Sequence, residues 1–226
     1  MLKMTAVCNA GIYVEYQDSG LLIDGIASDY LGFTGLTEEL YRQALGREAL
    51  FRNLCGICFT HTHPDHCSPE LVRQLHQRQP QLTVLQPDEK TPPKGCIQCG
   101  PFSVSYMETP HMPHTFEQVR HFVLLIHAGN ETVYVAADAM IDAELHRTVL
   151  HDVNPDYIVI NPVYLTVPSM VSFLAEKNPK AIFVYHIPAD ADDQTGMRRK
   201  AERSIKRCCD QLPPITLAAH HPQRLL

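Results

Sequence analysis

The stretch Thr60–Pro69, THTHPDHCSP, places three histidines and an aspartate within six residues. It directly follows the apolar run LCGICF, residues 54–59, which has the length and composition of a buried strand. Imidazole nitrogens and carboxylate oxygens bind zinc and similar divalent ions, and several of them must converge on one point. A strand that ends in a loop can provide that convergence, so this stretch predicts a metal site.

The spacing inside the stretch indicates two neighbouring metals. His61 and His63 are two residues apart, so in an extended segment both side chains point to the same side and can share one ion. Pro64 fixes a bend, which lets Asp65 and His66 turn toward a second position. Paired sites of this kind hold their metals about 3.5 to 4 Å apart. A second metal needs further ligands from elsewhere in the chain.

Length and charge narrow the class of protein. The chain has 226 residues and a formal net charge of -6, from 19 Lys and Arg against 25 Asp and Glu. No basic run could follow a phosphate backbone, so we do not expect general nucleic-acid binding. No stretch has a signal-peptide core or approaches the roughly 18 apolar residues of a membrane helix. We therefore expect one cytoplasmic domain over residues 1–226, with a small-molecule substrate and no membrane partner; nothing indicates the oligomeric state.

The order of apolar segments predicts an α/β fold. Alternating or continuous apolar runs predict strands over residues 11–16, 21–25, 54–59, 82–86, 157–165 and 181–186, and hairpins over 94–110 and 121–139. Helices are predicted over 36–49, 69–78, 167–177 and 194–209, with Ser68 and either Asp192 or Asp193 as caps. Two packed sheets with helices outside satisfy this order.

The motif and its surroundings resemble a known family. HTHPDH matches the HxHxDH signature of the metallo-β-lactamase fold superfamily, and the other markers follow in the expected order: LLIDG with Asp24, ETPHMPH, YVAADA and IFVYHIP. The resemblance spans roughly Thr5 to Pro188 and is nearest to the compact branch that contains ascorbate-6-phosphate lactonase. It implies a four-layer αββα sandwich of two mixed sheets flanked by helices.

The resemblance also implies a ligand set. One metal would be held by His61, His63 and His111, the other by Asp65, His66 and His186, and Asp138 would bridge the two. His114 is the competitor for His111, because both fit the third-histidine segment. Asp65 and Asp138 would be the catalytic carboxylates, with Asp65 orienting the hydroxide and passing a proton to the leaving group. Asp24 would orient a ligand histidine.

This site implies a dinuclear metal-dependent hydrolase that uses a metal-bridging hydroxide on a small ester, lactone or phosphoester. Two zinc ions are expected, with manganese or iron as alternatives. The family's bridging aspartate usually follows glycine, whereas Ala137 precedes Asp138 here. True β-lactamases lack that aspartate, which argues against their activity. Two alternative hypotheses are an iron-dependent redox enzyme of the same fold, similar to a persulfide dioxygenase, and a non-catalytic metal-binding protein.

The eight cysteines include two CxxC pairs, Cys55 with Cys58 and Cys96 with Cys99. Residues three apart in a strand face opposite sides, so the first pair is not expected to chelate. The second pair is flanked by glycines but would supply only half the ligands of a zinc ion. Cys67 is read as a small packing residue in preference to a redox-sensitive thiol beside the metals.

The remaining candidates have no motif around them. Four aromatic residues in loops are considered as pocket lining, although packing is the more ordinary role of each: Tyr30, Phe33, Phe116 and Tyr164. Seven histidines are interpreted as surface or core residues: His76, His121, His127, His146, His151, His220 and His221.

Overall fold

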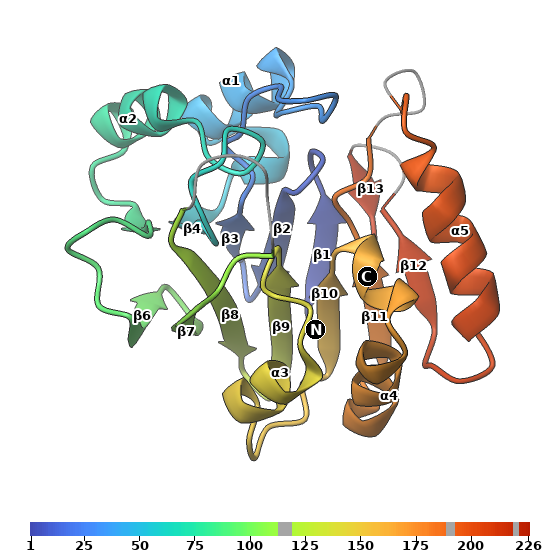
Figure 1. Ribbon diagram of the computed structural model, residues 1–226. Coiled ribbons are helices and arrows are strands. Elements are labelled where there is room, and N and C mark those ends of the chain that lie inside the picture. The colour runs from blue at the N-terminus through green and yellow to red at the C-terminus, as the bar shows by residue number, and fades with distance from the viewer. Residues whose placement is uncertain (113–118, 189–192, 219–221) are drawn as a thin grey trace.

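Two β-sheets pack face to face in the computed structural model, which describes residues 1–112, 119–188, 193–218 and 222–226 (Figure 1). The first sheet has the order β13-β1-β2-β3-β4-β5, with β1 (Lys3–Ala6), β2 (Ile12–Tyr16), β3 (Ser19–Ile23), β4 (Leu54–Cys58), β5 (Thr83–Leu85) and β13 (Gln223–Arg224). The second has the order β12-β11-β10-β9-β8-β7-β6, with β6 (Lys94–Cys99), β7 (Phe102–Thr109), β8 (His121–Ala128), β9 (Glu131–Ala137), β10 (Tyr157–Ile160), β11 (Ala181–Val184) and β12 (Ile215–Leu217).

Helices cover the outer faces of both sheets (Figure 1). They are α1 (Glu38–Gly46), α2 (Pro69–Arg78), α3 (Ala143–Val149), α4 (Pro168–Lys177) and α5 (Met197–Cys208), with short 3-10 helices η1 (Ala49–Phe51) and η2 (Pro162–Thr166). Leu40 of α1 and Leu75 of α2 pack with Ile57 of β4, while Phe173 of α4 packs with Ile182 of β11. A third apolar cluster lies between the sheets. The predicted four-layer sandwich is therefore confirmed.

Strand direction determines where the site forms. β3, β4 and β5 run parallel to one another, as do β9, β10 and β11. β7 runs in the same direction as β9, because each is antiparallel to β8 between them. The carboxyl ends of parallel strands meet at the same edge of a sheet. The segments after β7, β9, β10 and β11 therefore gather at one edge of the second sheet.

The helix ends follow the sequence predictions with small shifts. The N-cap position of α5 is Gly196 and not the predicted Asp192 or Asp193, but the Asp193 carboxylate still accepts hydrogen bonds from the backbone N–H groups of Met197 and Arg198 at 2.8 and 2.9 Å. Ser68 precedes α2 as predicted, but its side chain makes no capping hydrogen bond. Among the described residues, no helix has the length and apolar character needed to cross a membrane.

Two local expectations are wrong. The strand expected over 157–165 ends at Ile160, because Asn161 caps a 3-10 helix that begins with Pro162. In β4, a β-bulge shifts the pairing from Gly20↔Leu54 to Leu21↔Gly56. The extra residue changes the alternation of side chains, so Cys55 and Cys58 both pack against the cluster between the sheets.

Candidate metal centre

The HTHPDH segment forms a tight loop between β4 and α2. The backbone N–H groups of His66 and Cys67 both donate to the carbonyl of His63, at 2.9 and 2.8 Å. This turn reverses the chain after Pro64 and directs the later side chains back toward the earlier ones. His61 and His66 are fully buried, and His63 and Asp65 are buried with 7 % and 4 % of their surface exposed.

Three later segments bring one side chain each to the same place. His111 follows β7, Asp138 follows β9 and His186 follows β11. Ala137 has a φ of 48° and His186 a φ of 60°, so the backbone turns sharply at both strand ends. An isolated bridge between His111 and Ala139 holds the first two segments side by side.

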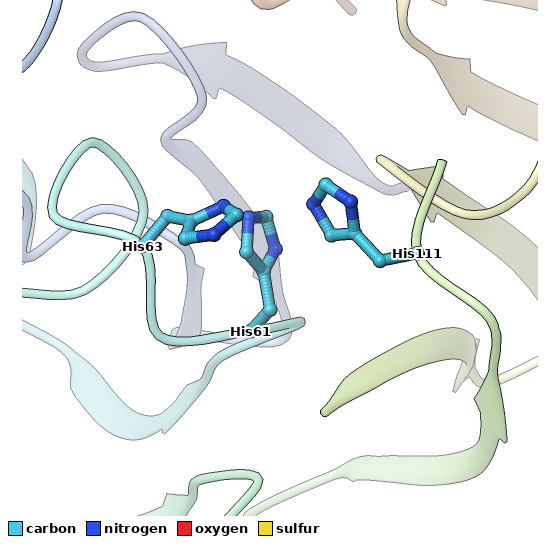
Figure 2. A group of neighbouring side chains, drawn as sticks. All are labelled: His61, His63 and His111. Atoms are coloured by element: carbon cyan, nitrogen blue, oxygen red, sulfur yellow. The ribbon is translucent and has the colours of Figure 1, made fainter. Parts of the chain in front are cut away.

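The structure brings all seven predicted ligands together. Their ligand atoms form three overlapping groups, within each of which every pair lies within 4.8 Å. The groups are His61, His63 and His111; His61, His66 and Asp138; and Asp65, His66 and His186. Figure 2 shows the rings of the first group, which approach one another from two separate segments. His111 thus lies beside His61 and His63, and the structure does not compare it with its competitor His114, which lies outside the described residues.

Asp138 lies at the centre of these groups. Its Oδ2 atom is 3.9 Å from His61 Nε2 and 3.9 Å from His111 Nε2 on one side. On the other side it is 3.5 Å from His66 Nε2 and 3.4 Å from His186 Nε2. A single carboxylate oxygen therefore faces four imidazoles that belong to both predicted metal positions.

Neighbouring polar groups fix the ligand imidazoles. The Asp24 carboxylate is 3.1 Å from His66 Nδ1 and accepts hydrogen bonds from the Thr60 backbone N–H at 2.7 Å and the Thr60 hydroxyl at 2.6 Å. His61 Nδ1 lies 3.1 Å from the same hydroxyl. His111 Nδ1 is 2.7 Å from the carbonyl of Met112. The Nδ1 atoms of these three rings are thereby engaged, which leaves their Nε2 atoms to face the centre, an arrangement typical of metal-binding histidines.

The other oxygen of Asp138 is held by a residue that sequence reasoning missed. Asn161, 5 % exposed and directly after β10, donates from Nδ2 to Asp138 Oδ1 at 2.8 Å. Its own Oδ1 accepts from the Val163 backbone N–H at 3.1 Å, which fixes the orientation of the amide. Asn161 could have been identified from its position directly after β10, a parallel strand that lies between the strands leading to Asp138 and His186.

Burial and mutual charge set the protonation of the centre. Burial alone would raise the pKa of Asp138, but the imidazoles of His186 and His66 outweigh it and hold that pKa well below its usual range. Burial would lower the pKa of His66, but the Asp24 carboxylate outweighs it and raises the pKa well above its usual value. The pKa of His186 is also raised, against burial, by Asp138 and Asp65. Burial lowers the pKa of His61 well below normal.

These features fit a divalent metal centre. Two ligand atoms that each lie about 2.0 Å from a tetrahedral ion are separated by about 3.3 Å. The separations of 3.4 to 3.9 Å around Asp138 Oδ2 are close to that value. The buried Nε2 atoms of His61 and His66 have no hydrogen-bond partner among the described residues. Buried polar atoms are normally satisfied, and a bound cation would satisfy these.

His121 is a further buried histidine at the centre, contrary to its sequence interpretation as a residue without a role there. Its ring lies 5.3 Å from that of His61 and 5.6 Å from that of His111, and its Nδ1 is 3.1 Å from the hydroxyl of Thr109. It opens β8, and the Thr109↔His121 pairing puts it at the site edge. No local motif marks this position, because only the antiparallel register creates it.

His146 belongs to the core, as predicted. Its Nδ1 is 2.7 Å from the Tyr134 hydroxyl, and its Nε2 lies 3.1 Å from both the Tyr164 hydroxyl and the carbonyl of Met140. Tyr164 is fully buried in this network and so is not pocket lining. Because Met140 comes two residues after Asp138, the network supports the segment that carries the central carboxylate.

Phe33 and Cys67 have different relations to the centre. The Phe33 ring packs edge-on against His186 with centroids 4.4 Å apart, so Phe33 borders the site. Cys67 is fully buried, and burial raises the pKa of its thiol to about 12, which agrees with a packing role. Phe116, His220 and His221 lie outside the described residues.

Comparison with known proteins identifies the fold of the chain. No family model and no curated protein matches the sequence. Among solved structures, the metallo-β-lactamase fold protein YhfI from Bacillus subtilis has a TM-score of 0.66 and 12% identity, covering 99% of this chain and 98% of that one. An isothiocyanate hydrolase from Delia radicum gut bacteria has a TM-score of 0.68 and 13% identity, with coverages of 99% and 98%.

A third similar structure is larger. CmlA, a diiron β-hydroxylase from Streptomyces venezuelae, has a TM-score of 0.62 and 13% identity over 99% of this chain. The present chain spans about half of its length, 54%. At such identities the likeness shows the fold alone. The chain has the metallo-β-lactamase fold, and its His and Asp clusters are suited to divalent metals.

Proposed function

We propose that this chain, which has the metallo-β-lactamase fold, is a dinuclear metal-dependent hydrolase acting on a small ester, lactone or phosphoester. The observation that carries the proposal is the position of Asp138 Oδ2, between 3.4 and 3.9 Å from four imidazole Nε2 atoms. The Asp138 carboxylate would therefore help to hold both cations.

Each residue has a defined part in this proposal. His61, His63 and His111 would hold one metal, and Asp65, His66 and His186 the other. Two divalent cations in such a site lower the pKa of water toward about 7 and polarise the oxygen of the substrate. The nearby His186 helps to hold the pKa of Asp65 below its usual range, so this carboxylate is ionised at neutral pH and can accept a proton. It can then return that proton to the leaving group.

The test is a substrate panel on protein reconstituted with zinc or manganese. The panel contains lactones, carboxylic esters, phosphomonoesters, phosphodiesters and, because a similar structure is an isothiocyanate hydrolase, isothiocyanates. We expect hydrolysis in one of these classes and its loss in Asp138→Ala, with Asp152→Ala, an exposed aspartate, as the control. Hydrolysis retained in Asp138→Ala would contradict the proposal.

An iron-dependent redox enzyme is the second candidate. The donor set of histidine and aspartate also suits iron, and the similar CmlA is a diiron enzyme. Iron as the main metal in the purified protein, with oxygen uptake that depends on a thiol or persulfide substrate, would favour it. Zinc or manganese together with hydrolysis would favour the first proposal.

A further inference from the structure

The sandwich brings the two CxxC motifs of the sequence together. Cys55 and Cys58 lie in β4 of the first sheet, and Cys99 is the last residue of β6 in the second. Cys58 and Cys99 are fully buried in the same apolar cluster between the sheets, and Cys55 packs against it. Cys96, the first residue of the second motif, is exposed and its Sγ lies 3.2 Å from the Ser103 hydroxyl.

The backbone is arranged for close approach of these thiols. A Cβ atom at Gly56 would lie 2.6 Å from the Sγ of Cys99, so any larger residue at 56 would displace that thiol. The Cys55 Sγ atom lies 3.2 Å from the carbonyl oxygen of Gly20 and 3.5 Å from that of Cys99. Cys58 is two residues from Gly56 and so lies on the same face of β4, the face that Cys99 contacts. The proximity of the two thiols raises the pKa of Cys58 and lowers that of Cys99. The bulge at Cys55 therefore turns β4 so that one motif meets the other across the sandwich.

These thiols do not form a metal site among the described residues, where every group of three closely spaced ligand atoms consists of histidine and aspartate. Two buried thiols packed in one cluster on adjoining strands of the two sheets can instead form a disulfide. We propose that Cys58 and Cys99 form a reversible disulfide that joins the two sheets, with a small-molecule disulfide such as oxidised glutathione as the oxidant.

The reaction is a pair of thiol–disulfide exchanges. Cys99 ends the edge strand β6 and is the thiol that local opening exposes first, which makes it the first nucleophile, and Cys58 lowers its pKa. Its thiolate attacks one sulfur of oxidised glutathione, releases one reduced glutathione and forms a mixed disulfide. Cys58 then loses its proton, attacks the Cys99 sulfur and displaces the second glutathione. Two protein thiols are oxidised by two electrons, and one glutathione disulfide is reduced to two thiols.

The topology gives the oxidant a route. β6 is the edge strand of its sheet, and Cys99 is its final residue, next to the turn at Gly100. Edge strands open locally at lower free energy than central ones, so Cys99 can be exposed without unfolding the core. The bond would connect strands of different sheets at a point three residues before His61. Because it constrains the unfolded chain, we expect the melting temperature to rise by about 5 to 15 °C.

Peptide mapping tests the inference directly. The full-length protein is equilibrated with oxidised and reduced glutathione, alkylated, and digested with trypsin. Cleavage after Arg52, Arg73, Lys94 and Arg120 puts the first motif in a peptide of residues 53–73 and the second in a peptide of residues 95–120. A Cys58–Cys99 bond joins these two peptides, whereas bonds within either motif leave them separate. We expect the joined species, in a ratio that follows the glutathione potential.

Single variants assign the bond. Cys58→Ser and Cys99→Ser should lose the joined peptides, while Cys55→Ser and Cys96→Ser should retain them together with the rise in melting temperature. The last two variants keep the test decisive if substitution of the fully buried cysteines impairs folding. Joined peptides that persist in Cys58→Ser, bonds found only within the motifs, or no bond at a large excess of oxidised glutathione would each overturn the inference.

Discussion

Asn161 Nδ2 donates a hydrogen bond to Asp138 Oδ1 at 2.8 Å, while the Oδ2 atom of the same carboxylate faces the imidazoles of the candidate metal centre. The two oxygens of Asp138 thus have separate tasks: one is anchored to the protein and the other is presented to the metals. Because the amide is itself fixed by the Val163 backbone N–H, the carboxylate is held in one orientation.

The first prediction concerns this anchor. Asn161→Ala should weaken metal binding about 10- to 100-fold, as loss of a hydrogen bond to a metal ligand does. Competition with a chromogenic chelator measures the affinity. Asn53→Ala, at an exposed asparagine in the turn before β4, is the control and should bind metal as the unaltered protein does. If Asn161→Ala binds metal as tightly as the control, Asn161 does not support the metal centre.

The second prediction concerns Asp24, which is fully buried and serves Thr60 and His66 together. Asp24→Asn removes the charge and one acceptor oxygen, so we expect a loss of about 3 kcal/mol in the free energy of unfolding together with weaker metal binding. Urea unfolding of metal-free protein measures the first and metal titration the second. Asp18→Asn, at an exposed turn, is the control. Equal stability of the two variants would contradict this account of Asp24.

The third prediction is that metal binding releases protons. In the metal-free centre the pKa of Asp138 is lowered, whereas the pKa values of His66 and His186 are raised, so the two imidazoles are protonated to a greater extent than free histidines are. A metal must displace those protons. Calorimetry at pH 7 in buffers of different ionisation enthalpy should show about one to two protons released per chain, and affinity should increase with pH. Binding without proton release would contradict the assigned protonation.

The fourth prediction gives the pH dependence of metal-free stability. The depressed pKa of Asp138 contributes stability that is present above about pH 4 and is lost as the pH falls through the folded value. The raised pKa of His66 contributes stability that is complete below about pH 6.5 and is lost as the pH rises through its folded value. The lowered pKa values of the buried His61 and His121 act in the other direction, because below about pH 6.5 the unfolded chain binds protons that these residues exclude when folded. We therefore expect a maximum near pH 6.5, measured by urea unfolding. A maximum far from that pH would show that another group governs stability.

Local sequence determined much of the centre. His61, His63, Asp65 and His66 could be grouped because they share one short loop, and a turn of the backbone there is enough to make them converge. Asp138 and His186 could be added because YVAADA and IFVYHIP resemble segments of the superfamily, and the structure places both just after strands of the parallel part of the second sheet. The first grouping depends on spacing within one loop, whereas the second depends on the resemblance.

Residues whose positions depend on packing between distant segments could not be predicted in this way. His121 reaches the centre through the antiparallel register of β7 and β8. Tyr164, considered for the pocket, is drawn into the core by its hydrogen bonds to His146 and the carbonyl of Ala139. The bulge at Cys55 reversed the expected facing of that residue, because one extra residue in a strand changes the alternation.

The most direct test of the central claim is the number of metal ions bound per chain, measured by elemental analysis after purification and again after reconstitution and desalting. We expect about two divalent ions per chain in the unaltered protein, and one or none in Asp138→Ala. At most one ion in the unaltered protein after reconstitution, or two ions retained in Asp138→Ala, would contradict a centre organised around that carboxylate.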